Sequence, residues 1–150
     1  MEDGSALRCD LANLKSERLV VRRVEFSGCR LTGATLAEPR LEDVIFSDCR
    51  IDLASFRFGR LTRVRFEGCR LTEADFQAVT ASACTFVDCD LTRAQLSQGK
   101  FAGSAFRGCR LDGLRGLEAL RGTAVAAGDL AELADAFAAS LAIDVRDDIE

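Results

Sequence analysis

The sequence predicts an all-β solenoid built from square coils, and two nested repeat lengths indicate this fold class. Every fifth residue from Phe26 to Leu111 is apolar, and 17 of these 18 positions hold Leu, Ile or Phe. A period of five fits neither an α-helix, with about 3.6 residues per turn, nor a strand, whose side chains alternate. The pattern is satisfied when the chain turns a corner every five residues and each side sends one large and one small side chain inward.

A repeat of twenty residues tests this arrangement, because four sides close one coil and coils stack about 4.8 Å apart. The sequence contains this repeat in two ladders of inward residues. The phenylalanine ladder consists of Phe26, Phe46, Phe66, Phe86 and Phe106. The cysteine ladder holds six of the seven cysteines, namely Cys9, Cys29, Cys49, Cys69, Cys89 and Cys109. We therefore expect about five and a half coils with these ladders in their interior.

The chain is expected to form a single domain of residues 1–150, in which residues 6–115 make the coils. Ala6 and Ser16 occupy large-residue positions of the first coil, so this coil is expected to be the weakest. The repeat fades after Leu111. An open end would expose apolar rungs and unpaired backbone groups. Residues 116–150 are therefore predicted to cap the C-terminal end of the solenoid.

The cap is expected to contain an amphipathic α-helix over about residues 129–141. Asp129 suits the N-cap position, since its carboxylate can accept a hydrogen bond from a free backbone N–H of the first turn. Four large apolar residues share one face of this helix: Leu130, Leu133, Phe137 and Leu141. We expect this face to cover the last coil.

The repeat units resemble those of the pentapeptide-repeat family, whose motif is commonly written Ala-(Asp/Asn)-Leu-x-x. The matching segments are Ala74-Asp75-Phe76, Ala94-Gln95-Leu96 and Cys89-Asp90-Leu91. The resemblance implies a right-handed quadrilateral β-helix, with the handedness coming from the family. It also implies the fold of the quinolone-resistance members, which interact with DNA gyrase. Because some members join through their C-terminal ends, the helix face is also a candidate homodimer contact.

The residue types argue against an enzyme. The chain has no His, the commonest general base and metal ligand, and no Gly-rich phosphate loop or nucleotide fingerprint. The cysteine ladder could have a chemical role, by binding a soft metal or by forming disulfides between coils. The other interpretation is that these are buried structural thiols. Ala, Val, Gly and Ser fill equivalent positions, so we favour structural thiols. We expect no catalytic residue, no cofactor and no metal.

Cysteine content and hydropathy predict a cytoplasmic protein. Seven cysteines in a chain without a secretory signal favour reduced thiols, and residues 1–6 are too short and acidic for such a signal. No apolar run approaches the roughly 18 residues that cross a membrane. We therefore expect no membrane association.

The charge distribution bears on two possible functions, imitation of DNA and direct binding of nucleic acid. The chain carries a net charge of −4, whereas residues 6–113 hold 17 basic and 14 acidic residues, a net of +3. An imitation of duplex DNA needs negative charge along its length, so this balance disfavours a DNA mimic. A net of +3 without an aromatic platform also argues against direct nucleic-acid binding.

One surface site stands out as a protein contact. Leu53 and Phe58 are predicted to point outward on adjacent sides of one coil, with Arg57 and Arg60 flanking the aromatic ring. An exposed aromatic beside Arg is typical of binding surfaces. We therefore expect a non-catalytic scaffold that binds an unidentified protein partner through a rigid surface. The alternative is a DNA mimic that binds DNA gyrase or topoisomerase and modulates quinolone sensitivity.

Overall fold

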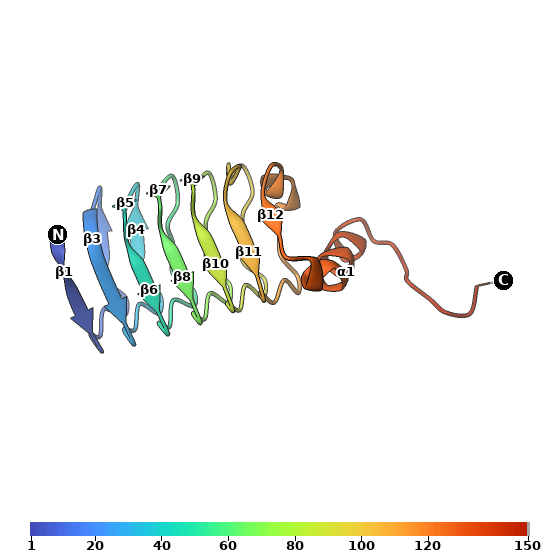
Figure 1. The fold of residues 1–150 in the computed structure, drawn as a ribbon, viewed down its shortest axis with the longest axis horizontal. Helices are drawn as coiled ribbons and strands as arrows, with labels where there is room; N and C mark the ends of the chain where they lie inside the picture. The colour runs from blue at the N-terminus through green and yellow to red at the C-terminus, as the bar shows by residue number, and fades with distance from the viewer. Residues whose placement is uncertain (150) are drawn as a thin grey trace.

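The computed structural model describes residues 1–149, and it confirms the predicted all-β solenoid. The chain winds through about six coils that stack along one axis, with a helix across the C-terminal end (Figure 1). The elements follow in this order: β1 (Glu2–Leu7), β2 (Lys15–Glu17), β3 (Val20–Ser27), β4 (Thr35–Ala37), β5 (Arg40–Glu42), β6 (Ile45–Ser47), β7 (Arg60–Thr62), β8 (Arg65–Glu67), β9 (Thr80–Ser82), β10 (Thr85–Val87), β11 (Ala105–Arg107), η1 (Leu117–Leu120), β12 (Ala124–Val125), η2 (Ala127–Asp129) and α1 (Leu130–Ser140).

All strand pairs are parallel, and their register is the twenty-residue repeat read from the sequence. Phe26 pairs with Phe46 in the neighbouring coil, and Phe46 pairs with Phe66. The long strand β3 turns a corner and so joins two sides of the coil into one ten-stranded sheet, while β2 and β4 form a separate pair on a third side. Only the last coil departs from this register, because β12 pairs Ala124 with Ala105, nineteen residues earlier.

The corners have a backbone conformation of their own. The corner residues, spaced five apart, have positive φ angles, for example 52° at Glu38, 54° at Asp43 and 51° at Asp48. This left-handed conformation reverses the chain direction locally and is costly for most residues other than Gly and Asn. Each corner therefore projects one side chain away from the coil. Leu53 and Phe58, both at φ 60°, occupy such corners.

The interior is packed by the predicted ladders. The rings of Phe46 and Phe66 stack with centroids 5.0 Å apart, and Phe66 and Phe86 follow at 4.9 Å. A second column of rings, including Phe56 and Phe76, packs against the first edge to face. The first coil is less well filled, since Ala6, Cys9, Leu11 and Leu19 are only partly buried. Stability is therefore shared between neighbouring coils and is weakest at the N-terminal end.

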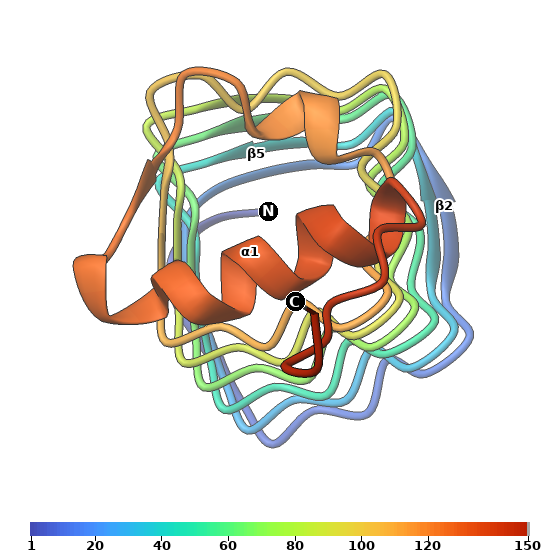
Figure 2. The same ribbon diagram turned by 90° about the vertical axis from the view of Figure 1, so that its right-hand side faces the viewer.

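The C-terminal helix α1 lies across the end of the coil stack (Figure 2). It buries Ala136 and packs Leu133 against the core, while Leu130, Phe137 and Leu141 are exposed. Asp129 stands at the N-cap position without a side-chain bond to the helix. Its Oδ2 instead accepts a hydrogen bond from the backbone N–H of Gly108 at 2.7 Å, so Asp129 links the start of the helix to the last coil.

Candidate functional site

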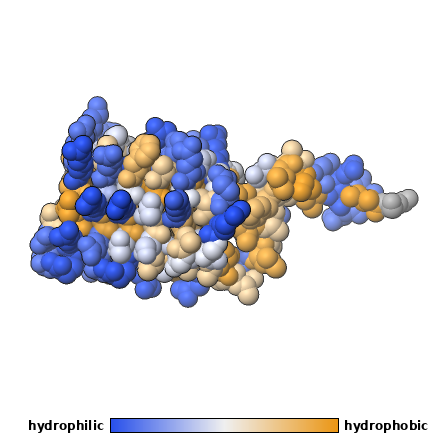
Figure 3. All heavy atoms as spheres, turned by 90° about the horizontal axis from the view of Figure 1, so that it is seen from above, coloured by the Kyte–Doolittle hydropathy of each residue, from blue (hydrophilic) through white to orange (hydrophobic). Residues whose placement is uncertain are grey.

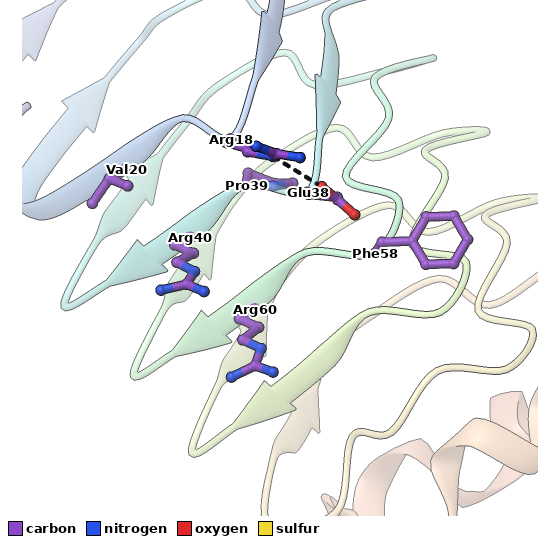
Figure 4. A pocket seen from close by; sticks show the side chains of 7 residues that line it. All are labelled: Arg18, Val20, Glu38, Pro39, Arg40, Phe58 and Arg60. Atoms are coloured by element: carbon purple, nitrogen blue, oxygen red, sulfur yellow. Dashed lines mark hydrogen bonds and ion pairs between the residues drawn. The ribbon is translucent and has the colours of Figure 1, made fainter.

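A groove of about 490 Å³ crosses three consecutive coils on the side that carries β5 and β7 (Figure 4). We call it the Phe58 groove. Its lining consists of Arg18, Val20, Glu38, Pro39, Arg40, Phe58 and Arg60. Its volume falls in the range of common ligand pockets, and both charged and apolar side chains line it.

The coil geometry explains the shape of the groove. One ridge is the corner column with Glu38 and Phe58, and the other holds Arg40 and Arg60, the first residues of β5 and β7. Pro39 lines the groove between them, and the equivalent position one coil later is Gly59. A Cβ at this position would lie 2.8 Å from the carbonyl oxygen of Phe56, so the backbone admits only glycine there without rearrangement.

The groove is electropositive. Arg40 and Arg60 pair in register on adjacent strands, so their side chains start about 4.8 Å apart. Within residues 1–149, neither has a carboxylate oxygen within 4.0 Å of its guanidinium group, whereas Arg18 pairs with Glu38 at 3.5 Å. Two like charges at this separation repel each other, and an anion between them removes that repulsion. The groove is therefore suited to a carboxylate or another anionic group.

Phe58 is the unusual residue of the groove. Its side chain is 61% exposed, although it is large and apolar. It also holds a left-handed backbone conformation, which is rare for a bulky side chain and costs about 1 kcal/mol. Neither core packing nor backbone preference explains a phenylalanine at this corner. An exposed aromatic ring on a strained backbone corner is a reason to infer a binding role.

The structure brings together two of the four predicted contact residues, Phe58 and Arg60. Arg57 points elsewhere, because its guanidinium group pairs with Asp75 and with the side-chain oxygen of Gln77, both at 2.6 Å. Leu53 is 57% exposed but lines a separate shallow hollow around the next corner.

Five residues of the groove, all from neighbouring coils, were not among the predicted contact residues. They are Arg18, Val20, Glu38, Pro39 and Arg40. The twenty-residue repeat contained the signal, since Arg40 precedes Arg60 by one coil and Glu38 precedes Phe58 by one coil. Reading the outward residues along columns, rather than along the chain, finds them.

The C-terminal end contains a second, more apolar hollow of about 650 Å³ between α1 and the last coil. Leu117, Leu120, Val125, Leu133 and Phe137 are among the residues that line it. Leu130 and Leu141, at 66% and 67% exposure, extend this apolar surface along the helix. In the space-filling view, hydrophobic side chains gather over this end of the molecule (Figure 3). Of the four predicted helix residues, only Leu133 packs mainly against the core.

The cysteine ladder forms hydrogen bonds to the backbone that were not predicted from the sequence. All seven thiols are free, and only Cys9 is not fully buried. The Sγ atoms of Cys49, Cys69 and Cys89 donate to the carbonyl oxygens of Phe26, Phe46 and Phe66, at 3.4, 3.2 and 3.3 Å. Burial raises the pKa of Cys84, and the adjacent Cys69 thiol together with burial raises that of Cys49. Cys49 and Cys84 are therefore neutral thiols that act as hydrogen-bond donors.

No group of three or more His, Cys, Asp or Glu side chains in residues 1–149 is arranged to hold a metal ion. No helix in this part of the chain is long and apolar enough to cross a membrane.

The parallel coils, five-residue sides and stacked interior ladders define a quadrilateral β-solenoid. Residues 59–116 match the family model described as a pentapeptide repeat region, so this part of the chain carries the pentapeptide repeat. No curated protein matches the chain significantly in sequence.

Solved structures are similar in fold. HetL, a pentapeptide-repeat protein involved in heterocyst differentiation regulation in the cyanobacterium Nostoc sp. strain PCC 7120, aligns with a TM-score of 0.55 at 18% identity. The match covers 80% of this chain and 63% of HetL, so this chain spans less than two thirds of that protein. QnrB1, a plasmid-mediated fluoroquinolone resistance protein, aligns at 17% identity with a TM-score of 0.49, covering 79% of this chain and 71% of QnrB1.

Proposed function

We propose that this protein is a non-catalytic interaction scaffold that binds a protein partner through the Phe58 groove. The observation that carries the proposal is Phe58, whose aromatic ring is exposed at a corner with a strained backbone. Beside it lie two arginines, Arg40 and Arg60, that have no ion-pair partner in residues 1–149. Aromatic and Arg side chains dominate the binding energy of many protein interfaces. A solenoid holds such side chains in fixed positions, so little conformational entropy is lost on binding.

Several features favour binding over catalysis. The chain offers no His, and its thiols other than Cys9 are buried and hydrogen-bonded to backbone carbonyls. The groove contains charged groups for recognition but no nucleophile next to a base. Free, buried thiols also suit a reducing compartment, which supports a cytoplasmic location.

A pull-down with a matched control tests the proposal. Immobilised protein is incubated with extract of its source cells, and retained proteins are identified and then purified for affinity measurement. We expect a partner that binds wild type and Ala83→Glu, a variant at an exposed corner on another side. Phe58→Glu and Arg60→Glu should weaken binding about tenfold or more. Equal affinity of the partner for all four proteins would refute the groove as the contact site.

Leu53 and Arg57 extend the proposed contact beyond the groove. Leu53→Glu reports whether the partner reaches the next corner. Arg57→Ala removes its pairing with Asp75 and reports whether that side contributes. A loss in either variant enlarges the contact, and unchanged affinity confines it to the groove.

The alternative function, a gyrase-directed DNA mimic, has weaker support. A mimic of duplex DNA needs regular negative charge. Here Arg30, Arg50 and Arg70 stand in register on three consecutive coils. A supercoiling assay with purified gyrase, with and without a quinolone, tests this alternative. Unchanged activity at tens of micromolar protein, a generous limit for such a contact, would eliminate it.

We also propose a homodimer through the C-terminal end. Leu130, Phe137 and Leu141 are exposed on α1, next to the apolar hollow, and their burial between two copies would remove apolar surface from water. Sedimentation of wild type and Phe137→Glu tests this contact. A wild type that stays monomeric at 100 micromolar, a concentration at which moderate dimers form, would refute it.

A further inference from the structure

The C-terminal tail complements the Phe58 groove in composition and charge. The groove lining has three arginines, one glutamate and three apolar residues, as given above. The tail, residues 143–149, has three aspartates, one arginine and three apolar residues. In sequence order these are Ile143, Asp144, Val145, Arg146, Asp147, Asp148 and Ile149. Each set also contains one charge of the opposite sign. This is Glu38 in the mainly basic groove and Arg146 in the mainly acidic tail.

The tail is presented away from the coils. Helix α1 ends in a turn in which Ala142 has a φ of 54° and Ile143 donates its N–H to the carbonyl of Ala138 at 2.8 Å. This turn directs the following residues outward beyond the helix (Figure 1). Ile143, Val145 and Ile149 are 55%, 71% and 67% exposed. Among residues 1–149, Arg146 pairs with Asp144 at 3.3 Å and with Asp148 at 3.9 Å, both in the tail.

The tail and the groove lie toward opposite ends of the solenoid. The Phe58 groove is lined by residues of the first three coils, from Arg18 to Arg60. The tail leaves beyond the helix that covers the last coil and points away from the coils (Figure 1). The direction of the tail therefore favours contact with a second copy over contact with the groove of its own chain.

We propose that the tail of one copy binds in the Phe58 groove of a second copy. The aspartates lie against Arg40 and Arg60, Arg146 joins Arg18 beside the carboxylate of Glu38, and the apolar tail residues cover Phe58 and Pro39. This inference rests on the proposed function, because it assigns a partner to the same groove. Tail and groove are different surfaces, so the contact either repeats head to tail from copy to copy or closes when two copies exchange their tails.

Charge-swapped variants of the full chain test this contact. Sedimentation of wild type should show association that grows with protein concentration and weakens as salt screens the pairs. The variant Arg40→Glu/Arg60→Glu and the variant Asp147→Arg/Asp148→Arg should each associate about tenfold more weakly. An equimolar mixture of the two variants should regain association, because a reversed tail then meets a reversed groove. The control Arg30→Glu/Arg50→Glu, on another side of the coil, should behave as wild type.

A labelled peptide of residues 142–149 separates this inference from the proposed function. Binding of the peptide to wild type, with loss on Phe58→Glu, supports tail docking. Lack of peptide binding, or a mixture of swapped variants that does not associate, overturns it. Association that resists salt and is abolished only by Phe137→Glu also overturns it, in favour of the helix dimer. If the pull-down still finds a partner that needs Phe58, the proposed function stands without the tail.

Discussion

The backbone N–H of Leu111 donates to Oε1 of Glu132 over 2.6 Å, so a side chain of the helix completes the hydrogen bonding of the last coil. At the equivalent position one coil earlier, Leu91 donates to the carbonyl of Arg110, and Leu71 donates to that of Asp90. Glu132 therefore replaces a carbonyl of the next coil, which the chain does not form. Asp129 does the same for Gly108.

Replacing Glu132 by Ala should destabilise the protein by about 1–3 kcal/mol, because the N–H of the buried Leu111 loses a charged acceptor. Denaturant unfolding measures the free energy. Asp135→Ala is the matched control, since Asp135 is exposed on the same helix. Equal stability of the two variants would show that the carboxylate does not cap the coil.

Replacing Phe66 by Ala should cost about 3–5 kcal/mol in the free energy of unfolding. The ring stacks between Phe46 and Phe86 and meets Phe56 and Phe76 edge to face, so truncation opens a cavity in the middle of both ring columns. Phe66→Leu retains most of the volume and should cost less. A loss below 1 kcal/mol for the alanine variant would contradict a closely packed interior.

The coil fold was predictable because each inward position repeats the same chemistry on every rung. The two ends were harder to predict, since pairing there depends on the backbone. Strand β1 begins at Glu2 and pairs Gly4 with Val24, although Glu2 and Gly4 carry no apolar signal. At the other end, β12 extends the coils to Val125, beyond the last regular repeat.

The candidate site was only partly predictable, for a related reason. Exposure of Phe58 follows from its position in the repeat, but the partners of the arginines depend on side chains one coil away. Arg57 and Arg60 look alike in sequence. Only the three-dimensional register shows that Arg57 pairs with Asp75 and Gln77, whereas Arg60 is free to line the groove.

Thiol burial predicts a specific response to pH. Burial raises the pKa of Cys84. The unfolded chain then releases this proton first, above about pH 8.5. Stability is therefore retained below that pH and falls as the pH rises, by up to about 1.4 kcal/mol per pH unit for this thiol.

Denaturant unfolding between pH 7 and pH 10 measures this slope, and Cys84→Ala should reduce it. In the native state at pH 8, a water-soluble disulfide reagent should modify Cys9 quickly and the six buried cysteines slowly. Rapid modification of most thiols would contradict their burial.

Replacing Phe58 by Asn should increase stability by about 0.5–1 kcal/mol while it weakens partner binding. Asn tolerates the left-handed corner conformation better than Phe does, and the exposed ring contributes little packing. Thermal and denaturant unfolding give the stability, and the affinity for the purified partner gives the function. Ala83→Asn, at an equivalent corner with φ 54°, should gain similar stability with unchanged affinity. A destabilised Phe58→Asn variant would mean that the ring supports the fold, and the argument from strain to binding would fail.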